Sequence, residues 1–270
     1  MRDTVIAFGR VTTNVGSFVT ARSAKVIESF GAFIIFSVAA FRAAFSRPWR
    51  RRLVLQHMEF IGYQSLGIVL ISGFFIGAVF SLQIGHIFRI FGAQAMLGAA
   101  TGKSLSRELS PLVTGFLLAG RAGAAITAEI GTMRVTEQVD AMEAMAVDPL
   151  DYLVGPRLLA SMLMFPILVG IFNVMGMLGA IAVSVVIFDI DQAMFWEKLT
   201  RLVKMKDLFA GLQKAVPFGA IISLLGCRFG LETKGGAKGV GLATTNSVVA
   251  MLLTLIGVDF VITYVQIMTK

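Results

Sequence analysis

The sequence predicts an all-α integral membrane protein, with five transmembrane helices, an N-terminal interfacial helix and a short cytoplasmic helix. Hydrophobic residues make up 56% of the chain and charged residues only 15%, and the mean hydropathy is +0.82. Residues 60–88 and 158–188 contain no Asp, Glu, Lys or Arg. Each segment exceeds the roughly 20 apolar residues that cross about 30 Å of hydrocarbon. The long apolar runs therefore favour helical spans over the short alternating segments of a β-barrel.

The region before the first span is basic. Nine of the 24 Lys and Arg residues lie before residue 53, and the last three of them are Arg50, Arg51 and Arg52. Such a cluster is typical of the cytoplasmic side of a membrane protein, next to anionic headgroups. Residues 26–45 are apolar but too short to span comfortably, and their bulky side chains share one helical face. We expect this segment to be an interfacial helix on the cytoplasmic surface.

Five spans follow, alternating in direction. Odd-numbered spans run outward and even-numbered spans return, so we expect the N-terminus to be cytoplasmic and the C-terminus to lie outside. Residues 189–206 form a charged outer helix or loop, and residues 231–245 form a glycine-rich cytoplasmic loop. The expected spans are about 58–84, 93–128, 157–188, 207–230 and 246–268, within a single domain of residues 1–270.

Two pairs of glycines at a spacing of four residues occur within the expected spans. Gly73 and Gly77 lie in the first span, and Gly226 and Gly230 lie in the fourth. Small residues at this spacing let helix backbones approach closely. We expect packing sites here, with dimerisation as the alternative.

Residues 120–151 form an acidic island between two apolar segments, and the island carries six of the 16 acidic residues. Val135, Val139 and Met142 recur at helical spacing and predict one amphipathic helix over about 130–147. A charged helix between two spans is suited to docking on a soluble partner. An ordinary solvated loop helix is the alternative.

Four ionisable residues fall at membrane depth: Arg107 and Glu108 in the second span, Lys214 in the fourth and Asp259 in the fifth. A charge at mid-bilayer costs roughly 2.5–3.5 kcal/mol on insertion scales, so such groups usually face a cavity or pair. Glu108 and Leu112 share one narrow helical face. Arg107 then lies at the cavity edge or pairs with Asp259. The site either meets a charged or zwitterionic headgroup, or its charges pair with one another and only lock the bundle.

Several other chemistries are disfavoured. Residues 98–104 look like a phosphate-binding P-loop, but Leu97 stands where the first glycine must fall and no buried strand precedes it. His57 and His86 belong to no metal-binding motif, and Cys227 is the only cysteine. We therefore expect no metal, no cofactor in this chain and no enzymatic activity. Nucleic-acid binding is also not expected, because the basic residues lie beside spans rather than on a soluble domain.

The chain resembles the MlaE permease family, also called YrbE, in two stretches. Residues 104–160 read SLSRELSPLVTGFLLAGRAGAAITAEIGTMRVTEQVDAMEAMAVDPLDYLVGPRLLA, and residues 243–264 read ATTNSVVAMLLTLIGVDFVITY. The resemblance implies an inner-membrane permease of an ABC-type lipid transporter. In that family two permease copies pair, cytoplasmic ATPases bind ATP and Mg, and a periplasmic MCE-domain protein conducts the lipid.

The resemblance also assigns roles to particular residues. Arg107 and Glu108 match the pair that lines the family's lipid cavity, and Lys214 and Asp259 align with other intramembrane charges. The sequence around Lys214 departs from the family pattern by adding Pro217. The segment 130–147 would be the coupling helix, seated in a groove of the ATPase. Its expected contact residues are Arg134, Val135, Glu137, Val139, Met142, Glu143 and Asp148.

The function expected is passage of a phospholipid between the inner membrane and a periplasmic MCE-domain partner, driven by a separate ATPase. One alternative is a self-contained transporter or channel in which Glu108 and Asp259 bind protons or ions. Another is a structural scaffold for an envelope complex, in which the buried charges have no part in transport. Dependence of lipid transfer on ATP separates the first two interpretations.

Overall fold

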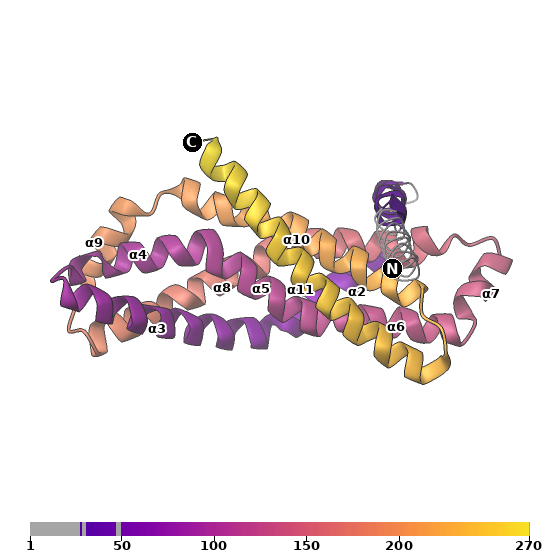
Figure 1. The fold of residues 1–270 in the computed structure, drawn as a ribbon, viewed down its shortest axis with the longest axis horizontal. Helices are drawn as coiled ribbons and strands as arrows, with labels where there is room; N and C mark the ends of the chain where they lie inside the picture. Colours follow the sequence, from indigo (N-terminus) through magenta and orange to yellow (C-terminus); the bar gives the residue numbers. More distant parts are fainter. Residues whose placement is uncertain (1–27, 29–30, 47–49, 270) are drawn as a thin grey trace, which may run out of the picture.

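The structure is a computed structural model, and it describes residues 28, 31–46 and 50–269. Every regular element in this part of the chain is a helix. Figure 1 shows an elongated bundle, with α7 (Gln138–Ala144) at one end and α9 (Gln192–Leu202) at the other. The helical stretches long and apolar enough to cross a membrane are Arg51–Ile90, Gln94–Val135, Leu150–Val186, Met205–Leu231 and Gly236–Met268. The predicted all-α membrane fold with five spans is confirmed.

Each of the first three stretches is assembled from consecutive helical pieces. The first contains α2 (Arg51–Ile61), η1 (Tyr63–Ser65) and α3 (Leu66–Ile90). The second contains η2 (Gln94–Met96), α4 (Leu97–Ser104), η3 (Leu105–Leu109), α5 (Ser110–Leu118), η4 (Ala119–Gly123) and α6 (Ala124–Val135). The third contains η5 (Leu150–Val154) and α8 (Gly155–Val186). The last two are the single helices α10 (Met205–Leu231) and α11 (Gly236–Met268).

The glycine-rich loop expected at residues 231–245 is wrong in its extent. α10 ends at Leu231 and α11 begins at Gly236, so most of the expected loop is the first part of a helix. Gly235 and Gly236 have φ of +86° and +67°, a backbone conformation that glycine adopts without steric cost. The glycines that follow lie inside α11. Glycine content therefore marked a tight turn rather than a long loop.

Two of the π-helical turns have their cause in proline. Pro111 lacks the N–H that would bond the carbonyl of Arg107, and η3 ends two residues before it. Pro156 stands in the same relation to Tyr152, next to η5. A missing hydrogen bond allows the helix to widen and to accommodate an extra residue. The turn at η3 sets the directions of the two charged side chains that it carries.

Close packing of α3 against α8 depends on glycine. A Cβ at Gly77 would collide with the backbone of Gly176, and a Cβ at Gly73 would lie 3.0 Å from the carbonyl oxygen of Phe172. Both glycines of the first expected pair therefore face a neighbouring helix of the same chain. The expected role as a packing site is confirmed for this pair.

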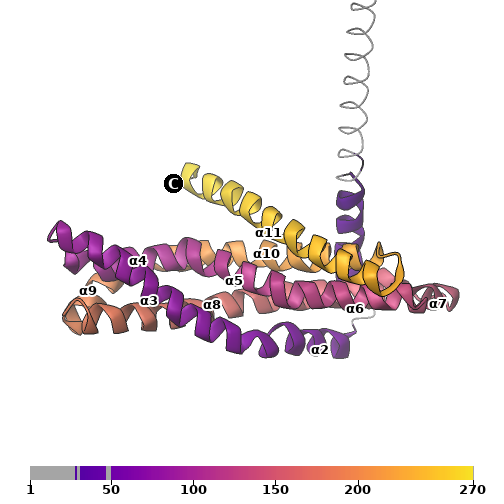
Figure 2. The same cartoon turned by 60° about the horizontal axis from the view of Figure 1, so that its bottom comes forward.

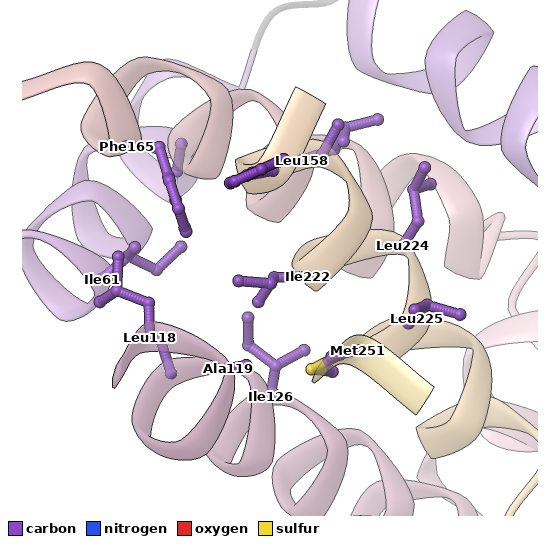
Figure 3. Packing of buried hydrophobic residues seen from close by; sticks show 14 of the residues in the cluster. Ile61, Leu118, Ala119, Ile126, Leu158, Phe165, Ile222, Leu224, Leu225 and Met251 are labelled. Atoms are coloured by element: carbon purple, nitrogen blue, oxygen red, sulfur yellow. The ribbon is translucent and has the colours of Figure 1, made fainter. Parts of the chain in front are cut away.

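The second glycine pair contributes to the core where α6, α10 and α11 meet. A Cβ at Gly226 would lie 3.2 Å from side-chain atoms of both Ile126 and Met251, and Gly230 faces α6 in the same way. Figure 3 shows Ile126, Ile222 and Met251 close together in this core. The core thus joins the second, fourth and fifth spans into one unit.

The apolar helix Gly31–Phe45 runs across the spans rather than alongside them (Figure 2). It packs on the start of α8, where a Cβ at Gly155 would lie 3.2 Å from the backbone of Ala43. Ala40 and Ala44 are buried, whereas Ile35 is exposed. This direction is the one expected of a helix that lies in the plane of a membrane surface.

α11 is the least covered of the five spans. Only 11% of its most apolar window is buried, against 28–56% in the other four. Its buried residues, Ser247, Met251 and Leu255, all lie in its first two thirds. Figures 1 and 2 both show its C-terminal part diverging from the bundle. A long apolar surface on this helix is therefore left to lipid or to another protein.

Candidate functional site

Three helices bring charged side chains together inside the bundle. Glu108 lies in η3, Lys214 in α10 and Asp259 in α11. Lys214 follows the first residue of its helix, Met205, by nine positions, and Asp259 precedes the last residue of its helix, Met268, by nine. At 1.5 Å per residue both lie roughly 14 Å from their helix end. The two charges are thus at the same level of the bundle.

Lys214 is the centre of this group, which we call the Lys214 cluster, and it is fully buried. Its ammonium forms an ion pair with Glu108 and another with Asp259, where Nζ and Oδ1 are 2.9 Å apart. It also donates to Thr263 Oγ1 at 2.7 Å. Thr263 Oγ1 donates in turn to Glu108 Oε2 at 3.3 Å. The ammonium therefore has three oxygen partners, two from carboxylates with which it forms ion pairs and one from a hydroxyl.

Close contact between the backbones of α10 and η3 makes this arrangement possible. A Cβ at Gly211 would collide with the carbonyl oxygen of Ser106, so the two helices approach each other directly. Gln266 Nε2 donates to the carbonyl oxygen of Ala210 at 3.0 Å and ties α11 to the same part of α10. The cluster therefore lies where the backbones of η3 and α10 meet and where a side-chain hydrogen bond attaches α11 to α10.

Arg107 belongs to a second, adjacent ion pair. Its Nη1 lies 3.7 Å from Asp207 Oδ1, while Asp207 Oδ2 accepts a hydrogen bond from the backbone N–H of Lys204. Asp207 stands in the first turn of α10, where the helix dipole favours a carboxylate. The expected alternative in which Arg107 pairs with Asp259 is wrong, because Lys214 already occupies that carboxylate.

The Lys214 cluster is open on one side. The exposed fractions of the side chains are 0% for Lys214, 14% for Asp259 and 39% for Glu108. One positive and two negative formal charges give the cluster a net negative charge. Glu108 is its most exposed member, so this negative charge is accessible at the Glu108 carboxylate. A carboxylate in this position suits a cationic group such as an ammonium. An anionic group would instead find Arg107, whose Nε is buried without a hydrogen-bond partner among the described residues.

The structure therefore brings together three of the five residues expected to form a lipid site: Glu108, Lys214 and Asp259. Lys214 is enclosed by its partners and reaches no open surface. Arg107 points to the start of α10. Leu112 is half-buried and packs against the main core rather than standing free below Glu108.

The acidic island does not form the single helix expected over residues 130–147. α6 ends at Val135, Glu137 has a φ of +61°, and α7 covers only seven residues. Ala146 has a φ of +58°, which ends the segment. Left-handed backbone interrupts the helical spacing, so the apolar residues of the island do not form one continuous stripe. The expectation of one continuous amphipathic helix is wrong.

Four of the expected coupling residues line one cleft. The cleft has a volume of about 370 Å³, lies between α7 and the end of α10, and includes Arg134, Val139, Glu143 and Asp148 in its lining. Arg134 forms an ion pair with Asp140 across the bend. The remaining three, Val135, Glu137 and Met142, do not line it.

Val139 does not present an apolar surface to a partner. Only 2% of its surface is exposed, because its side chain packs between α7 and the rest of the chain. Met145, just beyond α7, is 68% exposed instead. The surface of the island that remains available to a soluble protein therefore includes the exposed Glu137, Asp140 and Glu143 together with Met145.

Sequence reasoning missed Arg157 and treated it as the boundary of a span. Arg157 is buried, its Nη2 lies 2.8 Å from Glu129 Oε1, and its Nη1 donates to the carbonyl oxygen of Leu153 at 2.8 Å. The pair connects α8 to α6, the helix that leads into α7. The available signal was an arginine directly after Pro156, at the start of an otherwise uncharged span.

No group of three or more His, Cys, Asp or Glu side chains capable of holding a metal ion occurs among residues 28, 31–46 and 50–269. The charged groups of the Lys214 cluster bind one another. Their arrangement offers the partly exposed Glu108 carboxylate to a polar group from outside the cluster.

Comparison with known proteins gives a consistent result. The family model described as Permease MlaE matches residues 54–265. A probable ABC transporter permease protein of Synechocystis is 43% identical over 80% of this chain and 82% of its own length. A probable ABC transporter permease protein of Rickettsia felis is 39% identical over 93% and 96%. The intermembrane phospholipid transport system permease protein MlaE of Haemophilus influenzae is 37% identical over 93% and 97%.

Five apolar spans, a charge cluster at membrane depth and these relatives define a multi-pass membrane permease of the ABC transporter class. The chain belongs to the MlaE permease family. The family expected from the resemblance of residues 104–160 and 243–264 is thereby confirmed.

Proposed function

We propose that this permease moves phospholipid between the inner membrane and a periplasmic MCE-domain protein, with ATP and Mg bound by a separate cytoplasmic ATPase. The name of the Haemophilus relative, a phospholipid transport permease, supports the cargo. The observation that carries the proposal is the half-exposed Glu108 in the Lys214 cluster. Ionisable groups inside spans are costly and mark transport pathways, and a carboxylate at this depth meets the ammonium of a zwitterionic headgroup.

A second copy of the chain completes the cavity in this proposal. The exposed surface of α11 supports it, because only 11% of its most apolar window is buried by the described residues. Phe260 and Val261, next to Asp259, are exposed on the same helix. Pairing of two copies through α11 covers these side chains and places two Glu108 carboxylates around one lipid path.

Coupling to the ATPase follows from the continuity of the second stretch. Gln94–Val135 carries Glu108 in its first half and leads into α7 at its end. Movement of α7 on a cytoplasmic ATPase therefore displaces the helix that holds Glu108. In this arrangement the N-terminus and α7 are cytoplasmic and the C-terminus is periplasmic. The helix Gly31–Phe45 lies on the cytoplasmic surface.

The test uses the complex with its ATPase in proteoliposomes and measures transfer of labelled phospholipid with and without ATP. We expect Glu108→Gln to reduce ATP-dependent transfer about tenfold, because a charge-assisted bond to the headgroup is lost. Glu197→Gln, an exposed position in α9, is the matched control and retains transfer. Normal transfer by Glu108→Gln would contradict the proposal. Transfer driven by an ion gradient without ATP would favour the ion-coupled alternative.

A further inference from the structure

A cavity separate from the Lys214 cluster lies beside the helix Gly31–Phe45. Its volume is about 510 Å³, which falls within the usual range of small-molecule sites. The helix Gly31–Phe45, α2 and the first turns of α8 line it. Its apolar lining includes Val54, Leu55, Pro156, Leu159 and Leu163. The cavity therefore occupies the seam between the surface helix and two spans.

The polar lining of this cavity contains an unsatisfied arginine. Arg50 Nη1 is buried and has no hydrogen-bond partner among the described residues, although the guanidinium lies 4.7 Å from the centre of the Tyr152 ring. A buried N–H without an acceptor is unfavourable, and native structures rarely leave one. Arg51 lines the same cavity. The cavity thus presents one buried guanidinium N–H without an acceptor and a second guanidinium, that of the exposed Arg51, to an anionic group.

One acidic group stands in the same lining. Asp151 contributes to the cavity wall, and its Oδ1 accepts a hydrogen bond from Ser46 Oγ at 3.4 Å. A bare anion gains nothing from this carboxylate or from an apolar wall. A molecule with a phosphate, an ammonium and a hydrocarbon chain uses all three surfaces.

We propose that the cavity binds one aminophospholipid of the cytoplasmic leaflet. Its phosphate lies on Arg50 and Arg51, since guanidinium groups match phosphate oxygens bidentately. Its ammonium lies near Asp151, and one acyl chain follows the apolar wall. Leu55 and Leu163 are 63% and 53% exposed, so the wall continues to the surface that faces hydrocarbon. Binding of this lipid does not depend on transport. The bound lipid fills the space between the helix Gly31–Phe45 and the two neighbouring spans.

The first experiment measures lipid retention. The full chain is placed in nanodiscs of equal parts phosphatidylethanolamine and phosphatidylcholine, extracted into detergent, and weighed with its bound lipids by native mass spectrometry. We expect Arg50→Gln to lower retention of phosphatidylethanolamine about tenfold, through loss of charge-assisted bonds. Arg52→Gln is the matched control, because Arg52 is exposed and does not line the cavity. Equal retention by these two variants would overturn the proposal.

A second pair of variants tests the apolar part of the site independently. Leu163→Trp fills the cavity and should expel the lipid. Ile167→Trp lies one turn later at similar exposure, outside the cavity lining, and should not. Asp151→Asn should remove the preference for phosphatidylethanolamine over phosphatidylcholine. Absence of any such preference in the unaltered chain would refute the aminophospholipid assignment.

Two further measurements separate this site from other sources of bound phosphate. Phosphorus NMR with inorganic phosphate alone should show no phosphate binding that depends on Arg50. If phosphate binding were lost in Arg50→Gln, the cavity would be a free-anion site and the proposal would be overturned. The part of the phosphatidylethanolamine retention that depends on Arg50 should be the same in a Glu108→Gln background as in the unaltered chain. Retention that falls in Glu108→Gln, but not in Arg50→Gln, would place the retained lipid at the Lys214 cluster and overturn the proposal.

Discussion

Lys214 is fully buried, whereas Glu108, one of the two carboxylates it pairs with, keeps 39% of its side chain exposed. Burial and pairing make the lysine a determinant of stability, because its removal leaves two negative charges together in a region of low dielectric constant. Exposure makes Glu108 the member of the cluster that other molecules reach. The two interpretations of the buried charges, bundle locking and cargo contact, therefore apply to different residues.

Replacement of Lys214 tests the locking role. We expect Lys214→Met to destabilise the chain by about 3–5 kcal/mol, the cost of breaking a buried ion pair on one side. Combining it with Glu108→Gln and Asp259→Asn should recover much of the loss, since no charge then remains unpaired. Cys227, the only cysteine, is buried, so its labelling by a thiol-reactive dye reports thermal unfolding. An unchanged midpoint for Lys214→Met would rule out the locking role.

For individual residues, the sequence identified the charged side chains at membrane depth but not the partners with which they form ion pairs. Pairing depends on how far each helix is rotated, and the widened turn at η3 alters that rotation. Pro111 was the available sign of the widened turn. Asp207 and Thr263 were not anticipated, because an aspartate at a helix start and a threonine in a span are common and carry no distinctive pattern.

Among the elements, α7 departs most from its predicted form. The spacing of its apolar residues predicted helical structure, yet a turn at Glu137 in left-handed conformation separates α7 from α6. Glutamate in that conformation costs roughly 1–2 kcal/mol, which the tertiary contact of Val139 offsets. Local spacing cannot reveal such a bend. By contrast, the spans were predictable in number and approximate position, because hydropathy over 20 or more residues dominates local effects.

Two substitutions separate the stability of α7 from its contact with the ATPase. Val139→Asp places a carboxylate in a buried position, and we expect it to destabilise the chain by roughly 2–4 kcal/mol. Met145→Asp changes an exposed side chain and should release the ATPase on co-purification while the thermal unfolding midpoint stays constant. Full retention of the ATPase by Met145→Asp would exclude this surface from the contact.

For the molecule as a whole, five spans place α7 and α9 on opposite sides of the membrane. Single cysteines at Asp140 and Glu197, in a chain with Cys227 replaced by Ala, are read out with a membrane-impermeant thiol reagent. We expect labelling of Glu197→Cys and of Thr269→Cys from the periplasmic side, and labelling of Asp140→Cys only after the membrane is opened. Labelling of all three from one side would be incompatible with five crossings.

The sharing of Lys214 between two carboxylates also has a consequence for biogenesis. Spans leave the ribosome in chain order, so Glu108 is already in the membrane when Lys214 arrives, and Asp259 comes last. When Lys214 enters the membrane, only one of its two counter-ions, Glu108, is already there. The second, Asp259, arrives when α11 is inserted. Until then the fourth span lacks the contacts of Lys214 with Asp259 and Thr263. Integration of α11 is the step that closes this interval and completes the assembly of the permease.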